Sequence, residues 1–158
     1  YDIMSSDWSS DVCSSDLGTS LSALMLCERR DDPRMKPNVL LGFNPPGQLL
    51  KPEHRATKFA GRAEEYCPTC NLVRTDAPVL IFHGDADQTV DPADVIAFTE
   101  AMAAEGNRCE LVMYPGEGHS FFHLDRKEGT IFVDTMRRCD ALFTELGWIE
   151  PISKLHKT

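Results

Sequence analysis

Apolar and polar residues follow one another along this chain in blocks that predict strands and helices in turn. Three short apolar runs, each closed by glycine, proline or asparagine, predict strands at Val39–Phe43, Val79–His83 and Glu110–Tyr114. The first run, "NVLLGFNPP", is continuously apolar, which predicts a strand buried on both faces. Segments whose apolar residues recur at helical spacing lie between these strands and on either side of them. The alternation predicts an α/β protein with parallel strands and flanking helices.

The predicted helices differ in how clearly their ends are marked. The helix after the second strand has Asp91 as N-cap, Pro92 at its first position and Gly106 as its stop. Its expected apolar side consists of Val95, Ile96, Phe98 and Met102. Helical spacing also predicts helices at Gly18–Asp32 and Gly129–Trp148. Residues 47–77 form a polar, proline-punctuated stretch in which we expect one short helix, near Glu53–Tyr66.

The first seventeen residues show neither the helical nor the strand periodicity of apolar residues. Back-translation of "DWSSDVCSSDL" (Asp7–Leu17) gives the insert-proximal end of a common short-read sequencing adapter at all eleven residues. The match extends upstream through Tyr1 and Ile3, with a difference at Asp2. We therefore expect residues 1–17 to be a non-native segment and residues 18–158 to be a partial domain.

Composition narrows the possible partners. A length of 158 residues suits one domain, and a formal charge of −9 offers no basic surface for nucleic acid. No apolar run has the length of a membrane span, so we expect no membrane partner. The compartment stays open between secreted or periplasmic and cytoplasmic. Without Cys13 of the first segment five cysteines remain, an odd number that fixes no redox compartment.

Two of the predicted strands end in loops that hold a carboxylate and a histidine. "HGDADQTV" carries Asp87 three residues after Gly84, and "YPGEGHSFF" carries His119. The carboxyl ends of neighbouring parallel strands meet at one edge of a sheet, where ligand sites form. An acid after one strand and a histidine after the next match the second and third members of a hydrolase triad.

These segments resemble the α/β-hydrolase fold, in the bacterial esterase branch related to prolyl oligopeptidases and to acetyl-xylan or feruloyl esterases. The resemblance rests on "PVLIFHGDADQTVDP", "GNRCELVMYPGEGHSFF" and "VLLGFNPP", and it covers residues 18–149. It implies that Asp87 is the acid and His119 the histidine of a Ser-Asp-His triad. It also implies a small-molecule or carbohydrate-linked ester as substrate and no metal or organic cofactor.

Other residues compete for these roles. Asp85 is the alternative acid, but the family motif places the acid at Asp87. Asp91 is explained as the helix cap, and His83 and His123 as structural residues. "CPTC" (Cys67–Cys70) has no second cysteine or histidine pair, so we interpret it as reduced thiols or a local disulfide in preference to a zinc or redox site.

The sequence departs from the family pattern at the nucleophile. The Gly-x-Ser-x-Gly elbow is absent, because "GTSLS" places Ser22 where the last glycine should be. Ser20 is therefore interpreted as a residue in the first turn of the predicted helix Gly18–Asp32. Ser14 or Ser15 falls near the position of the family's nucleophile, which we interpret as a coincidence. We expect the serine and the first five strands to precede Gly18 in the parent protein. The isolated chain is then expected to be inactive and poorly stable or aggregation-prone, with an unpaired edge on its first strand.

The parent protein has three possible functions on this reading. An esterase is the leading prediction, a peptidase of the prolyl-oligopeptidase type is the alternative within enzymes, and a non-catalytic binding protein of the same fold is the alternative outside them. The sequence upstream of Gly18 would distinguish enzyme from binding protein.

Overall fold

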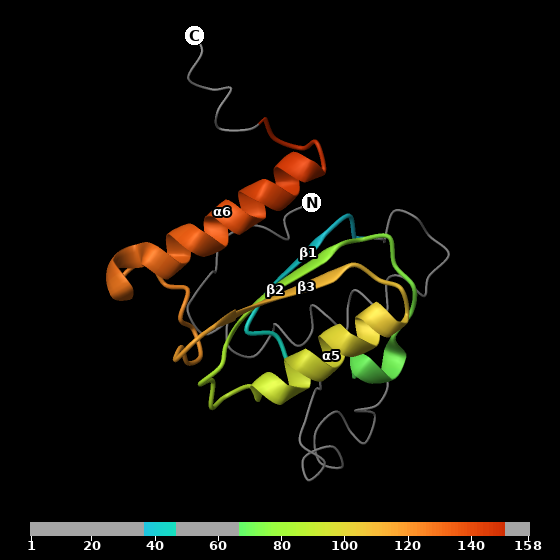
Figure 1. Ribbon diagram of the computed structural model, residues 1–158, viewed down its shortest axis with the longest axis horizontal. Coiled ribbons are helices and arrows are strands. Elements are labelled where there is room, and N and C mark those ends of the chain that lie inside the picture. The colour runs from blue at the N-terminus through green and yellow to red at the C-terminus, as the bar shows by residue number, and fades with distance from the viewer. Residues whose placement is uncertain (1–36, 47–66, 151–158) are drawn as a thin grey trace, which may run out of the picture. The chain divides into compact units, whose positions relative to one another are not determined.

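The computed structural model describes residues 37–46 and 67–150. Within them three parallel strands form one sheet in the order β1-β2-β3, with β1 at Leu40–Phe43, β2 at Val79–Gly84 and β3 at Cys109–Tyr114 (Figure 1). The register pairs Phe43 with Phe82 and Gly84 with Tyr114. The predicted α/β class and the three strands are thus confirmed. The expected helices at Gly18–Asp32 and Glu53–Tyr66, and the segment 1–17, lie outside the described residues.

Burial differs between the strands. All six residues of β2 are buried, whereas in β1 Gly42 is buried and the other three residues are half-buried. The expectation of two buried faces, made for β1, is therefore wrong, and β2 is the strand that is buried throughout. The reason is position: β2 has a paired strand on both sides, and β1 is an edge of the described sheet.

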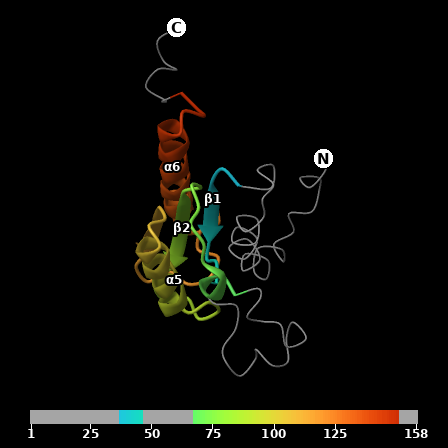
Figure 2. The same cartoon turned by 90° about the vertical axis from the view of Figure 1, so that its right-hand side faces the viewer.

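Helix α5, Pro92–Ala104, connects β2 to β3 and packs on this sheet (Figures 1 and 2). Asp91 caps it by accepting a hydrogen bond from the Ala93 N–H at 2.9 Å, and Gly106 follows its end with a φ of 76°. Val95, Phe98 and Met102 are fully buried and form a core with β2 residues Val79 and Ile81. Each fully buried side chain of this size contributes roughly 1.5–3 kcal/mol.

The expected apolar side of α5 is wrong at one residue. Ile96 is 41% exposed, although Val95 beside it is completely buried. Successive helical residues differ by about 100° in direction, and the spacing from Val95 to Phe98 and Met102 defines the buried face. Ile96 falls outside that face.

A second compact unit, Phe121–Thr158, contains the last helix, α6 at Thr130–Glu145. It follows a short 3₁₀ helix, η4 at Lys127–Gly129, and begins after Gly129, whose φ of 72° is left-handed. Thr135, Cys139 and Leu142 are its buried residues. Another 3₁₀ helix in the first unit, η3 at Thr69–Asn71, was not predicted. No helix in the described part of the chain is long and apolar enough to cross a membrane.

Candidate active site

The loops after β2 and β3 leave the same edge of the sheet and are joined by hydrogen bonds. The Asp85 N–H donates to the Tyr114 carbonyl at 3.2 Å, and the Ala86 N–H donates to the Glu117 carbonyl at 2.9 Å. The Asp85 side chain in turn accepts from the Gly116 N–H at 2.6 Å. Asp85 thus holds the two loops together and takes no part in binding the histidine.

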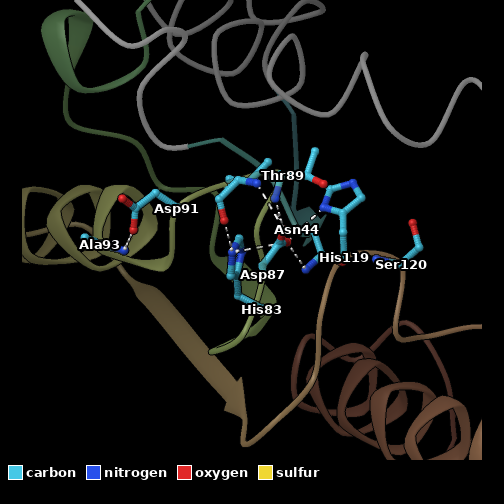
Figure 3. Close-up of polar contacts among 9 residues, drawn as sticks. Asn44, His83, Asp87, Thr89, Asp91, Ala93, His119 and Ser120 are labelled. Atoms are coloured by element: carbon cyan, nitrogen blue, oxygen red, sulfur yellow. Dashed lines mark hydrogen bonds and ion pairs between the residues drawn. The ribbon is translucent and has the colours of Figure 1, made fainter.

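Asp87 and His119 come together at this edge. Oδ2 of Asp87 lies 2.8 Å from Nδ1 of His119. Figure 3 draws the two side chains and their contact. The Asp87 side chain is fully buried, and that of His119 is 15% exposed. The two residues nominated from the sequence therefore form a direct hydrogen-bonded pair, although they are separated by 32 positions along the chain.

The turn that follows Asp87 holds the carboxylate from its other side. Oδ1 accepts the Thr89 N–H at 2.8 Å and the Val90 N–H at 3.0 Å. Burial alone would raise the pKa of Asp87, but the hydrogen bonds from Val90, His119 and Thr89 outweigh it, and the pKa lies below its ordinary value. Asp87 is therefore ionised at neutral pH.

A charged acceptor at Nδ1 determines which tautomer His119 adopts. In the neutral ring, Nδ1–H donates to Asp87, so the lone pair is on Nε2. That nitrogen can accept a proton, and the carboxylate stabilises the imidazolium that results. The pair can therefore act as the acid–base half of an acyl-transfer site.

Asn44 is a site residue that the sequence analysis missed. It directly follows β1, and its Nδ2 donates to Oδ2 of Asp87 at 3.1 Å (Figure 3). Its Oδ1 accepts the Ser120 N–H at 3.2 Å, next to His119. The available signal was its position, since Asn44 ends a predicted strand at the same sheet edge as the other two loops.

His83 lies behind the carboxylate. It is fully buried at the end of β2, with Nε2 3.2 Å from the Val90 carbonyl and 3.6 Å from Oδ2 of Asp87. The second distance is too long for a hydrogen bond. Burial lowers the pKa of His83 more than the Val90 carbonyl and the Asp87 charge raise it, so the ring is neutral. Its Nδ1 has no hydrogen-bond partner among the described residues.

The remaining candidates have other positions. Asp91 is the N-cap of α5, as expected. His123 belongs to the second unit, where its ring stacks on Phe122 with centroids 5.4 Å apart. Ser20, and Ser14 and Ser15 with it, lie outside the described residues.

The "CPTC" segment contains two reduced cysteines that differ in exposure. Cys67 is buried and Cys70 is exposed. The Cys70 N–H donates to the Cys67 sulfur at 3.3 Å, and the Asn71 side chain donates to the Cys67 carbonyl at 2.9 Å. Of the two interpretations left open by the sequence, the structure has the reduced form.

Comparison with known proteins gives a consistent family and fold. The model of the dienelactone hydrolase family matches residues 55–153. The thermophilic esterase 2 of the planctomycete Thermogutta terrifontis, with propionate bound, is 29% identical with a TM-score of 0.68 over 78% of this chain and 48% of its own. The same esterase phosphorylated by paraoxon gives 31% identity and a TM-score of 0.64 over 78% and 46%.

Two curated proteins are similar over shorter stretches. A protein of Methylorubrum extorquens assigned as a carboxymethylenebutenolidase is 45% identical over 49 residues, which are 31% of this chain and 16% of that protein. The isoprenylcysteine alpha-carbonyl methylesterase of Arabidopsis thaliana is 37% identical over 43 residues, 27% of this chain and 10% of that protein. The chain thus spans about half the length of the solved esterases and a smaller share of the curated relatives.

Proposed function

We propose that this chain, which belongs to the dienelactone hydrolase family, supplies the acid and the histidine of a serine hydrolase that acts on carboxylic esters. Family membership and the esterase neighbours support hydrolase chemistry. The observation that carries the assignment of residues is the 2.8 Å hydrogen bond between Oδ2 of Asp87 and Nδ1 of His119. A buried carboxylate in this position is what a histidine base requires.

In the proposed reaction a serine hydroxyl attacks the ester carbonyl carbon while Nε2 of His119 accepts the hydroxyl proton. The tetrahedral intermediate collapses, and the alcohol leaves with the proton that His119 returns. Water then attacks the acyl-serine with the same help from His119, which releases the carboxylic acid and restores the serine. Asp87 holds Nδ1–H throughout and stabilises the imidazolium in both steps.

The proposal places the nucleophile in the parent protein, upstream of Gly18. The absence of a Gly-x-Ser-x-Gly elbow from the printed sequence supports this position, as does the adapter match of residues 1–17. The oxyanion hole requires an N–H from a still earlier loop and belongs to the same upstream part. On this proposal the 158-residue chain alone does not turn over esters.

Substrates of the parent enzyme are proposed to be small carboxylic esters. The names of the similar proteins, an esterase, a methylesterase and a carboxymethylenebutenolidase, support an ester or lactone carbonyl as the reacting group. The family name favours cyclic enol esters as a second substrate class. The chemistry at Asp87 and His119 is the same for both classes, because each requires attack on an ester carbonyl.

The test begins with the DNA upstream of Gly18 from the source organism and expression of the complete gene product. We expect p-nitrophenyl acetate and an enol lactone to be hydrolysed, and a fluorophosphonate to label one serine. His119→Ala should lower kcat by about 10⁶-fold with that serine present. A proline-linked chromogenic peptide, used in parallel, measures the peptidase alternative.

Three results would contradict the proposal. An upstream sequence without a nucleophile at the elbow would make the protein a binding module. Labelling of a cysteine by iodoacetamide, with loss of activity and no labelling by fluorophosphonate, would replace the serine with a thiol. Full activity of the His119→Ala enzyme would remove the acid–base assignment.

A further inference from the structure

Asn44 occupies a position between the two residues of the pair. Its side chain is 1% exposed, and both ends of its amide are used. Nδ2 donates to Oδ2 of Asp87 at 3.1 Å, and Oδ1 accepts the Ser120 N–H at 3.2 Å (Figure 3). Its own N–H donates to the Phe82 carbonyl at 2.9 Å, which fixes Asn44 to β2. One side chain after β1 therefore links the loop of the acid to the loop of the histidine.

The hydrogen bond from Asn44 is made to the oxygen that contacts His119. Oδ1 of Asp87 is held by its own turn, through Thr89 and Val90. At Oδ2 the hydrogen-bonding side chains among the described residues are those of Asn44 and His119. The amide of Asn44 engages one lone pair of Oδ2, and the remaining lone pair is directed at Nδ1 of His119.

Both ends of the Asn44–Ser120 contact have unusual backbone conformations. Asn44 has a φ of 49° and Ser120 a φ of 58°, in the left-handed region that costs an ordinary residue free energy. Asparagine tolerates this region better than most residues. Such conformations persist where surrounding contacts hold them, and they concentrate at functional sites.

We propose that Asn44 is a positioning residue, which holds Oδ2 of Asp87 and the main chain after His119 at the separation that the acid–histidine hydrogen bond requires. This inference rests on the proposed function. A purely structural amide would fill space and satisfy its own hydrogen bonds without affecting the pair. A positioning amide affects the Nδ1–H of His119 and the rate of the chemical step, because a small displacement of a reacting group is costly.

Two substitutions separate the roles of the amide. Asn44→Gly removes both side-chain hydrogen bonds, and glycine accepts a φ of 49° without strain. Asn44→Asp retains the shape and an acceptor for the Ser120 N–H, but it puts a carboxylate oxygen where Nδ2 donated to Asp87. Because two carboxyl groups in contact cannot both ionise readily, one of the pair keeps its proton to higher pH than an isolated carboxyl group. His83 and His119 are the other titratable side chains near Asp87.

Nitrogen-15 NMR of the His119 ring in the complete gene product is the first measurement, since it needs no activity. The unsubstituted chain should show a low-field Nδ1–H resonance from the bond to Asp87, and Asn44→Gly should weaken it or shift it upfield. In the complete gene product, Asn44→Gly should lower kcat by about 100-fold with KM little changed. Asn44→Asp should move the acidic limb of the kcat/KM profile to higher pH.

Asn107→Ala is the matched control. Asn107 is also a buried amide that joins distant segments, accepting the Thr75 N–H at 2.8 Å and donating to the Val73 carbonyl at 2.9 Å. It precedes β3, whereas the site follows the carboxyl ends of the strands. We expect Asn107→Ala to lower Tm and to leave the His119 resonance, kcat and the pH profile unchanged.

The outcomes distinguish this inference from the proposed function. If the gene product hydrolyses no ester but Asn44→Gly still alters the His119 resonance, the function is wrong and the positioning role stands. An unchanged His119 resonance in folded Asn44→Gly would overturn the positioning role, whatever the activity. If neither variant folded while Asn107→Ala did, Asn44 would be a folding determinant, and the proposal would also be overturned.

Discussion

Gly84, the last residue of β2, lies directly against the carbonyl group of Glu117 in the loop that carries His119. A Cβ atom on Gly84 would be 2.6 Å from the Glu117 carbonyl carbon and 3.0 Å from the Gly118 carbonyl oxygen. Real Cβ atoms do not approach main chain so closely. The absence of a side chain at Gly84 therefore lets the histidine loop reach the loop of Asp87.

Gly84→Ala should displace the histidine loop, because the atoms it meets belong to main chain and cannot rotate away. We expect a loss of about 1–3 kcal/mol in the free energy of unfolding, typical of overpacking. A fall of about 100-fold in kcat/KM of the complete gene product should follow from the displacement of His119. Urea unfolding and steady-state kinetics measure the two effects.

Gly116→Ala is the control in the same loop. No atom of the described residues lies within 4 Å of the added methyl group, and the cost is the left-handed φ of 74°. The control should lose about 1–2 kcal/mol of stability but keep kcat/KM. Equal losses of kcat/KM in the two variants would show that the Gly84–Glu117 contact has no special part in placing His119.

The choice between Asp87 and Asp85 as the acid has a direct test by isosteric substitution. Asp87→Asn puts an N–H opposite Nδ1 of His119 or gives up the bonds from Thr89 and Val90. We therefore expect kcat to fall by about 10³–10⁴-fold. Asp85→Asn retains an oxygen acceptor for the Gly116 N–H, and most of the activity should remain. Steady-state kinetics of both folded variants distinguish the two residues. A larger loss of kcat in Asp85→Asn than in Asp87→Asn would make Asp85 the acid.

The sequence was sufficient for most of the described fold because burial and turns leave local signals. The three strands lie within one residue of the expected bounds, and the Asp91 cap and Gly106 stop of α5 are where their chemistry predicts. The predictions that rested on apolar character alone were wrong in two places: Ile96 was assigned to the buried side of α5, and β1 was expected to be buried on both faces. Both depend on which neighbours an element packs against, and local sequence does not record that.

The site was predictable in part for the same reason. Asp87 and His119 follow adjacent strands, so strand order alone brought them to one edge. Asn44 was missed because its role exists only across the fold: its partners are 43 and 76 positions away. The position of Asn44 after a strand was visible in the sequence, but the direction of its amide depends on a left-handed φ that no local pattern indicated.

Thiol reactivity should follow burial. Burial raises the pKa of Cys109 to about 11, and burial together with the Asp140 charge raises that of Cys139 to about 11. At pH 8 only about one in a thousand of these thiols is a thiolate, the reactive form. Among the cysteines of the described residues, iodoacetamide should therefore label exposed Cys70 first, as read by mass spectrometry, and buried Cys67 and Cys139 and half-buried Cys109 after addition of urea. Rapid labelling of Cys109 in the folded chain would contradict the raised pKa of its thiol.

Acid should destabilise the chain in two pH windows that belong to His83 and Asp87. Burial lowers the pKa of His83 in the folded chain below 6.5, so from pH 6.5 downward the unfolded chain binds a proton that the folded chain does not. The free energy of unfolding then falls by up to about 1.4 kcal/mol per pH unit. The lowered pKa of Asp87 makes the free energy of unfolding fall with pH in the same direction. Its stabilisation is present above pH 3.8 and is lost as pH falls through the folded pKa.

His83→Gln separates the two windows, because glutamine retains an N–H for the Val90 carbonyl and does not titrate. Lost packing and hydrogen bonding change the stability of the variant by an amount that does not depend on pH, so the slope below pH 6.5, and not the absolute stability, is the diagnostic quantity. We expect urea unfolding to give a steeper fall in the free energy of unfolding for the unsubstituted chain than for His83→Gln as the pH falls from 6.5. Equal slopes above pH 5 would mean that His83 accepts its proton in the folded chain as readily as in the unfolded one.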